Sequence, residues 1–304
     1  MLACRRKPLS LVGTFLALVT LAACNSSGGT ASSSTNGGSG GSSPPVNSSG
    51  FPGTPAAFAF VTNTNAGNIA TYTVSNGALS YTPSAVTETM TQSVPRWVTL
   101  NGNYAYVANA GFDDISTYSI SQGQLSVTPV STTNPIAGAR PNKIIVNSNG
   151  TMAYVGNLGG ADVSTFPIHN GVLAADPVGI TSPAGGYDMA GIILSPSEKH
   201  LYAVYFSTGS SGNGYVASFP LTNGVPATTP QSTTAVLAAT SPMGIAISPS
   251  GQDLYVVNTG TNNIATYAVN AGTLSSNPVS TTAALNGSTP FIDALDPSGN
   301  FLYV

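Results

Sequence analysis

The segment PMGIAISPSGQDLYVVNTGTNNIATYAVNAGTLSSNP, residues 242–278, holds the pattern that decides the fold. Its short apolar runs are separated by Gly, Asn and Ser, and no run shows a helical period. We expect strands over Gly244–Ser248, Asp253–Val257, Asn263–Val269 and Thr273–Pro278. The turn SPSG joins the first two strands, and NAG joins the last two. The segment therefore predicts a small antiparallel sheet of four strands.

The same phrase recurs along the chain from Phe58 onward. The aromatic residue of each YV pair marks one copy, and consecutive marks lie 46, 48, 48, 53 and 48 residues apart. These residues are Phe60, Tyr106, Tyr154, Tyr202, Tyr255 and Tyr303. Both faces of the third strand are apolar, so each sheet needs a neighbour on either side. Four strands per period of this length indicate an all-β fold, a β-propeller. A right-handed β-helix, with shorter and more uniform coils, is the alternative.

A proline recurs in the fourth strand of every copy. Proline cannot donate a hydrogen bond to a neighbouring strand, so we expect this strand at the outer edge of each blade. The prolines are Pro83, Pro129, Pro177, Pro230 and Pro278.

Charge is scarce in this chain, and its distribution excludes several functions. Only 6% of the residues are charged, and beyond the first seven residues the basic ones are Arg96, Arg140, Lys143 and Lys199. Nucleic-acid binding needs clustered Lys and Arg, so we expect no nucleic-acid partner. We also expect no cofactor and no metal, because no cysteine or histidine pattern with ligand spacing occurs.

The N-terminus reads as a targeting segment. Arg5, Arg6 and Lys7 precede an apolar run that ends in LAAC at Cys24, and the run is short for a transmembrane helix. LAAC resembles the lipobox of bacterial lipoproteins, which implies cleavage after residue 23 and a lipid on Cys24. An ordinary secretory signal with a chance cysteine is the alternative. The resemblance implies a protein of the cell envelope, held by its lipid in the outer membrane and facing the periplasm or the exterior.

Three regions follow from this reading. Residues 1–23 are the signal peptide, and residues 24–57 form a lipidated, disordered Ser/Gly-rich tether spanning roughly 30 Å. Residues 58–304 form the propeller repeats.

The landmarks YVAN, YVGN and YVVN, together with SPSG before LYV, resemble the YVTN-type repeats of lactonase-type propellers. That family includes 6-phosphogluconolactonases and surface repeat proteins, and its rings have seven blades. The repeats counted here amount to about five blades, entered at a second strand and incomplete at the C-terminus. A closed ring of seven would need roughly 80 further residues.

The resemblance also implies a working face around the central channel, where the family often carries a histidine after the proline that opens a repeat. The aligned residues here are Arg96, Asn142, Ala190, Met243 and Phe291. No histidine stands among them, and His169 and His200 fall in turns of the opposite face.

The working face offers a small set of candidate ligand-binding residues. Arg96, Trp97, Arg140 and Lys143 come from adjacent repeats and are able to hold a carboxylate or phosphate. Their alternative role is that of solvated loop cations.

The candidate catalytic bases are Asp113, Asp114 and Asp188, although capping of a loop is the commoner role of such residues. Asp293 replaces an isoleucine of an innermost strand, where a charge is costly unless it is paired. The asparagines that end YVxN read as structural residues that bond their own loop backbone.

From these observations we expect an envelope-anchored lipoprotein whose propeller serves as a binding or surface repeat module. The alternative is a lactone hydrolase. The sequence leaves open whether the protein is an enzyme, and if it is one, a lactonase is expected. The absent histidines and the scarce charge lead us to expect no hydrolysis of a phosphorylated sugar lactone.

Overall fold

The computed structural model describes residues 20–22, 57–75, 78–134, 138–182, 187–207, 212–235, 238, 240–284 and 289–304. Cys24, the tether up to residue 56 and the predicted signal peptide, apart from Thr20–Ala22, lie outside the described residues. All regular secondary structure within the described residues is β-strand.

The strands form five sheets of five strands each, followed by a sheet of two. The first contains β1 (Thr20–Ala22), β2 (Ala57–Asn63), β3 (Asn68–Ser75), β4 (Ala78–Leu79) and β5 (Ala85–Glu88). The second contains β6 (Pro95–Asn101), β7 (Tyr104–Asn109), β8 (Asp114–Ser121), β9 (Gln124–Leu125) and β10 (Ser131–Thr133). The third contains β11 (Pro141–Val146), β12 (Met152–Asn157), β13 (Asp162–His169), β14 (Val172–Leu173) and β15 (Gly179–Thr181).

The last sheets repeat this plan. The fourth contains β16 (Tyr187–Leu194), β17 (His200–Ser207), β18 (Gly214–Thr222), β19 (Val225–Pro226) and β20 (Ser232–Thr233). The fifth contains β21 (Pro242–Ile247), β22 (Asp253–Asn258), β23 (Asn263–Asn270), β24 (Thr273–Leu274) and β25 (Ser280–Ala283). The two-stranded sheet pairs β26 (Ala294–Leu295) with β27 (Leu302–Tyr303).

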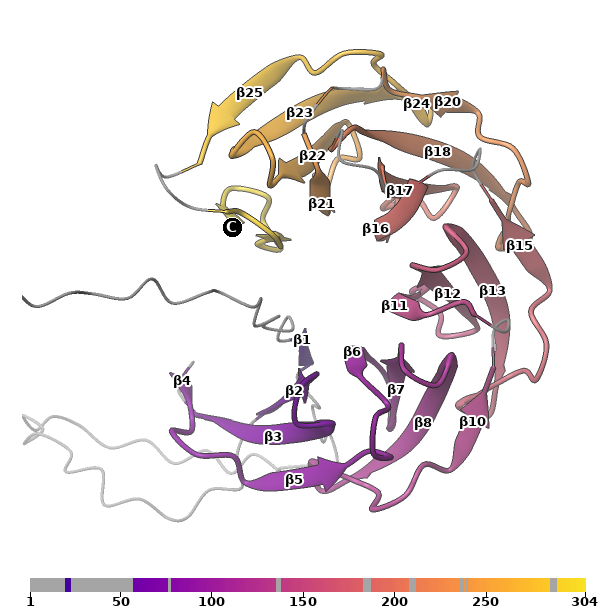
Figure 1. The fold of residues 1–304 in the computed structure, drawn as a ribbon, viewed down its shortest axis with the longest axis vertical. Helices are drawn as coiled ribbons and strands as arrows, with labels where there is room; N and C mark the ends of the chain where they lie inside the picture. The colour runs from indigo at the N-terminus through magenta and orange to yellow at the C-terminus, as the bar shows by residue number, and fades with distance from the viewer. Residues whose placement is uncertain are drawn as a thin grey trace, which may run out of the picture.

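The sheets follow one another round an arc, and each sheet turns one edge towards the centre of the arc (Figure 1). The strands β6, β11, β16 and β21 lie on the inside of the arc, and β10, β15 and β25 lie on the outside. Consecutive inner strands contact each other from sheet to sheet. This is the blade arrangement of a β-propeller, as the repeat period predicted. In the first sheet the inner place next to β2 is taken by β1, so the continuous chain enters that sheet at its second strand.

The expected fourth strand differs from the observed one. Instead of a continuous strand over Thr273–Pro278, β24 ends at Leu274 and pairs with the end of β23. Pro278 lies in the following bend, and the chain returns as β25 to pair with the first half of β23. The prediction of one unbroken strand was wrong because a proline without an N–H is better placed outside the ladder than at its edge. All five recurrent prolines lie in such bends.

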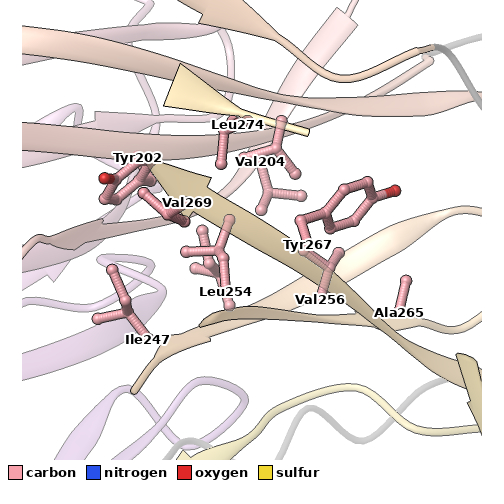
Figure 2. Packing of buried hydrophobic residues seen from close by; sticks show 11 residues of the cluster. Tyr202, Val204, Ile247, Leu254, Val256, Ala265, Tyr267, Val269 and Leu274 are labelled. Atoms are coloured by element: carbon pink, nitrogen blue, oxygen red, sulfur yellow. The ribbon is translucent and has the colours of Figure 1, made fainter. Parts of the chain in front are cut away.

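Four clusters of buried side chains hold the blades together, one at each contact between consecutive five-stranded sheets. Figure 2 shows the cluster between the fourth and fifth sheets, where Tyr202 and Val204 of β17 pack with Leu254 of β22 and Val269 of β23. Because the second, third and fourth sheets have such a cluster on both faces, their strands lack a polar face, which explains why both faces of the third strand are apolar.

The recurrent tyrosine also makes a polar contact with the next blade. Tyr106 donates its hydroxyl to the carbonyl of Gly171 at 3.0 Å, and Tyr154 donates to that of Gly224 at 2.8 Å. Both glycines have positive φ and lie in the turn before the short outer strand. Two landmarks of the repeat, the aromatic residue and the glycine turn, are therefore partners across adjacent blades.

Candidate active site

A β-bulge lies near the start of the innermost strand in four consecutive blades. The pairing register shifts between Pro95 and Trp97, and equivalent shifts occur at the start of the three following blades. The residues skipped by the ladder are Arg96, Asn142, Ala190 and Met243. A bulge bends its strand and re-aims the side chain of the extra residue. These four residues, with Phe291, line one cavity of about 230 Å³.

The sequence alignment of the repeats had put these five residues in one column, and the structure brings them together. The cavity therefore lies where the resemblance placed the working face. No sequence pattern indicated the bulges, since a bulge is defined by pairing with the second strand.

Trp97 and Lys143 stand next to the bulges and line the same cavity. The Lys143 ammonium lies 4.9 Å from the centroid of the Trp97 ring, within the range of a cation–π interaction. The indole N–H donates to Thr99 Oγ1 at 3.0 Å, and Thr99 donates to the carbonyl of Ile144 at 2.5 Å. This chain of hydrogen bonds joins two blades and fixes the ring against which the ammonium rests.

Asp293 supplies the carboxylate of the cavity. The residue is 8% exposed and takes the place that an isoleucine has in the third, fourth and fifth blades. Room for it comes from Gly244, where a Cβ would stand 2.6 Å from Asp293 Oδ1. Its other oxygen, Oδ2, is buried and has no hydrogen-bond partner among the described residues. A buried acceptor left unpaired is costly, so this atom is suited to meet a water or a ligand.

Burial and charge set the protonation of the two groups. Burial raises the pKa of Asp293 to about 6, against the opposing effects of the Lys143 charge and of backbone N–H groups at Asp293 and Ile245. Burial likewise lowers the pKa of Lys143, and the Asp293 charge opposes that shift. Each group favours the charged form of the other.

The two arginines are placed differently. Arg96 is half-buried and lines the cavity, and its pKa is lowered by burial and by the nearby positive charge of Arg140. Arg140 is exposed, precedes β11 with φ of 50° and is not among the residues that line the cavity. The expected patch therefore places Arg96, Trp97 and Lys143 in the cavity and Arg140 beside it.

The three predicted carboxylate bases do not line the cavity. Asp113 accepts hydrogen bonds from the backbone N–H groups of Gly138 and Arg140, both at 2.8 Å, and so caps the next blade's loop. Asp114 is buried and accepts from Asn109 Nδ2 at 2.7 Å, and burial raises its pKa. Asp188 lies in β16, where burial raises its pKa and Arg140 opposes the rise.

The recurrent asparagines form what we call the amide clamps. Asn109 Nδ2 donates to Asp114 Oδ1 at 2.7 Å and to Ser116 Oγ at 2.8 Å. Asn157 Nδ2 donates in the same way to Asp162 Oδ1 at 2.5 Å and to Ser164 Oγ at 2.9 Å. Asn63 and Asn258 also bond the side chain five residues on. We expected these asparagines to bond their own loop backbone, and this expectation was wrong. The side-chain Nδ2 donates across the hairpin to a side chain of the next strand.

The histidines lie away from the cavity. His200 begins β17, whereas Phe206 near the other end of that strand lines the cavity. The imidazole lies 3.2 Å from Gln231 Oε1. His169 is the exposed last residue of β13. No group of three or more His, Cys, Asp or Glu residues in the described ranges is placed to hold a metal ion.

Apolar side chains complete the cavity. Leu158, Met189, Phe206 and Ile292 line it together with those already named. In the part of the chain that the structure describes, no helix has the length and apolarity needed to cross a membrane.

Comparisons with known proteins agree with this architecture. Residues 54–186 and 216–304 match the family model described as "Lactonase, 7-bladed beta-propeller". No curated protein matches the chain significantly.

Similar solved structures include a proposed 6-phosphogluconolactonase from Bacteroides fragilis, with 23% identity, a TM-score of 0.65, and coverage of 77% of this chain and 69% of that one. The periplasmic gluconolactonase of Pseudomonas aeruginosa has 18% identity and a TM-score of 0.65, over 78% and 69% of the two chains. A proposed 6-phosphogluconolactonase from Bacteroides uniformis has 18% identity and a TM-score of 0.63, over 75% and 68%. Such identities establish a shared fold. The matched residues include three of the four bulged inner strands, β6, β11 and β21, and most of the cavity lining, and the chain belongs to the lactonase family of seven-bladed β-propellers.

Proposed function

We propose that the protein is a lactone hydrolase that works in the cavity lined by Arg96, Lys143 and Asp293. The observation that carries the proposal is the buried Asp293 carboxylate, whose Oδ2 has no partner among the described residues. Membership of the lactonase family and the gluconolactonase named among the similar structures support hydrolysis over a surface-binding role.

Each group has a chemical role in this reaction. The Asp293 carboxylate accepts a proton from a water molecule as the water oxygen bonds to the lactone carbonyl carbon. The carbonyl electron pair moves onto the oxygen, where the Lys143 ammonium stabilises the negative charge. Collapse of this intermediate breaks the ring C–O bond, and Asp293 returns the proton to the leaving alkoxide. The product is the ring-opened hydroxy acid, and Asp293 ends as it began.

The arginines hold the substrate and the product. Arg96 lines the cavity and binds a polar substituent or the carboxylate of the product, while Arg140 adds positive potential from beside it. Asp188, which lies near Arg140, is the competing candidate for the base.

Single carboxamide substitutions test the proposal on the full chain. With a δ-lactone substrate in a pH-stat, we expect Asp293→Asn to lower kcat by about a thousandfold, as removal of a general base does. Asp176→Asn changes an exposed carboxylate of the third blade and serves as the matched control, with kcat unchanged. Full activity in Asp293→Asn, or a comparable loss in Asp188→Asn alone, would overturn the role of Asp293. Absence of hydrolysis by the unaltered chain on any lactone would overturn the proposal itself.

We further propose that the protein is anchored to the cell envelope through a lipid on Cys24. The motif LAAC and the Ser/Gly-rich tether that follows support an outer-membrane lipoprotein facing the periplasm or the exterior. Removal of residues 1–23 would also take β1 away from the edge of β2.

Labelling tests the anchor. Radiolabelled palmitate is expected in the expressed protein and in Cys4→Ser, which changes the other cysteine. Label that persists in Cys24→Ser would contradict the proposal.

A further inference from the structure

The wall of the cavity is mainly apolar. Trp97 of β6, Phe206 of β17, Met243 of β21 and Phe291, which precedes β26, line it. Aromatic and thioether surfaces favour burial of carbon over hydroxyl groups. A ligand with apolar substituents would gain from this wall.

Two of the polar groups that line the cavity already have partners within the protein. Thr64 Oγ1 donates to the carbonyl of Pro95 at 2.9 Å, and Asn142 Nδ2 donates to the carbonyl of Ala190 at 3.2 Å. A sugar lactone brings several hydroxyl groups, and each one buried without a partner costs about 1–3 kcal/mol. The lining therefore disfavours a polyhydroxylated ring.

The charge of the cavity points the same way. Among the described residues, its ionisable lining groups are two bases, Arg96 and Lys143, and one acid, Asp293. A phosphate ester carries about −1.5 to −2 charges at pH 7. Two bases set against one acid match a neutral or singly charged ligand better than a phosphorylated one.

The volume of the cavity limits the size of the substituent that a bound lactone can carry. The cavity volume of about 230 Å³ lies below the roughly 300–1,000 Å³ that is typical of small-molecule sites. That space fits one ring with a short side chain.

We infer that the substrate is a neutral or singly charged lactone that bears a short alkyl or aryl substituent. That this ligand is a substrate rests on the proposed hydrolysis. The chemical class of the ligand is inferred from the cavity lining alone. It differs from the sugar lactones named for the similar structures.

Binding can be measured apart from catalysis because Trp97 is the only tryptophan of the chain. Its fluorescence reports on the cavity directly. The probes are lactams, which have the ring and carbonyl of a lactone but resist hydrolysis. We expect 6-propyl-δ-valerolactam to change the emission and to bind at least tenfold more tightly than gluconolactam. Matched lactones should show the same order of kcat/KM.

The outcomes separate the two proposals. Tighter binding of gluconolactam than of the alkyl lactam would overturn the inference, whether or not lactones are hydrolysed. Binding of the alkyl lactam without hydrolysis of any lactone would overturn the proposed function and still support the ligand class.

A variant of nearly equal size sharpens the test. Met243→Gln places an amide on the cavity wall and is expected to weaken binding of the alkyl lactam by about tenfold, the loss typical of one misplaced group in an apolar pocket. Met90→Gln makes the same change at a residue 55% exposed and outside the lining, and should leave binding unchanged. Equal affinity in Met243→Gln and the unaltered chain would contradict the apolar contact.

Discussion

The amide clamps and the charged groups of the cavity are two sets of polar residues, and they differ in how they recur along the chain. The clamp of the second blade, Asn109 with Asp114 and Ser116, is copied almost unchanged in the third blade. The cavity contains one Trp97–Lys143 contact and one buried Asp293, each at a position where other blades carry different residues.

The difference teaches how to read polarity in a repeat protein. A polar group that recurs in each copy satisfies a need that each copy has, here the buried amide and carboxylate at the hairpin between second and third strands. A polar group that occurs once serves no such need, and its burial costs free energy without being required by the blade. Single departures from the repeat are therefore where function is expected.

The largest expected effect comes from breaking a clamp. Asn157→Ala leaves the Asp162 carboxylate buried without its amide donor, so we expect the free energy of unfolding to fall by about 3 kcal/mol. The loss should be greater at pH 7 than at pH 5, because burial already raises the pKa of Asp162 and the lost donor favoured its ionised form. Urea unfolding at both pH values measures this.

Asn103→Ala, at an exposed turn residue, is the control for the clamp and should change stability little. An equal loss in the two variants would remove the distinction between recurrent and ordinary asparagines.

Replacement of Asp293 in the cavity is expected to have the opposite and smaller effect, a rise in the free energy of unfolding. The pKa of Asp293 is about 6 when folded and near 3.8 when unfolded, so the folded state loses stability as pH rises from about 4 through 6. Asp293→Asn removes this loss, and we expect the variant to be more stable at pH 7 by roughly 1–2 kcal/mol. At pH 4 the two chains should unfold at nearly the same urea concentration.

A variant that is less stable than the unaltered chain at pH 7 would show that Asp293 is a structural partner of Lys143. The contrast with the clamps would then fail.

The smallest effect concerns the support of the tryptophan. Thr99→Val keeps the shape of the side chain and removes the hydrogen bonds to Trp97 and Ile144. We expect a loss of about 1 kcal/mol in the free energy of unfolding and a change in Trp97 emission. Unchanged emission would mean that packing alone orients the indole.

The sequence by itself determined the features that depend on short-range rules. The period of the YV aromatic, the turns SPSG and NAG, and two apolar faces on one strand suffice for a propeller blade and its first three strands, whereas the fourth expected strand is divided in two. Alignment of the copies also placed Arg96, Asn142, Ala190, Met243 and Phe291 in one column, which lines the cavity.

Only the tertiary structure decided which members of different blades meet. The sequence analysis named Asp113 and Asp114, and not Asp293, as candidate bases, but their partners are the loop backbone and Asn109. The position of Asp293 depends on the missing side chain of Gly244, and Lys143 reaches Trp97 because each follows a bulge in adjacent blades. Bulge register and the curvature of the arc arise from pairing and packing between distant segments. Local sequence patterns do not encode those contacts, and so they could not choose among the carboxylates.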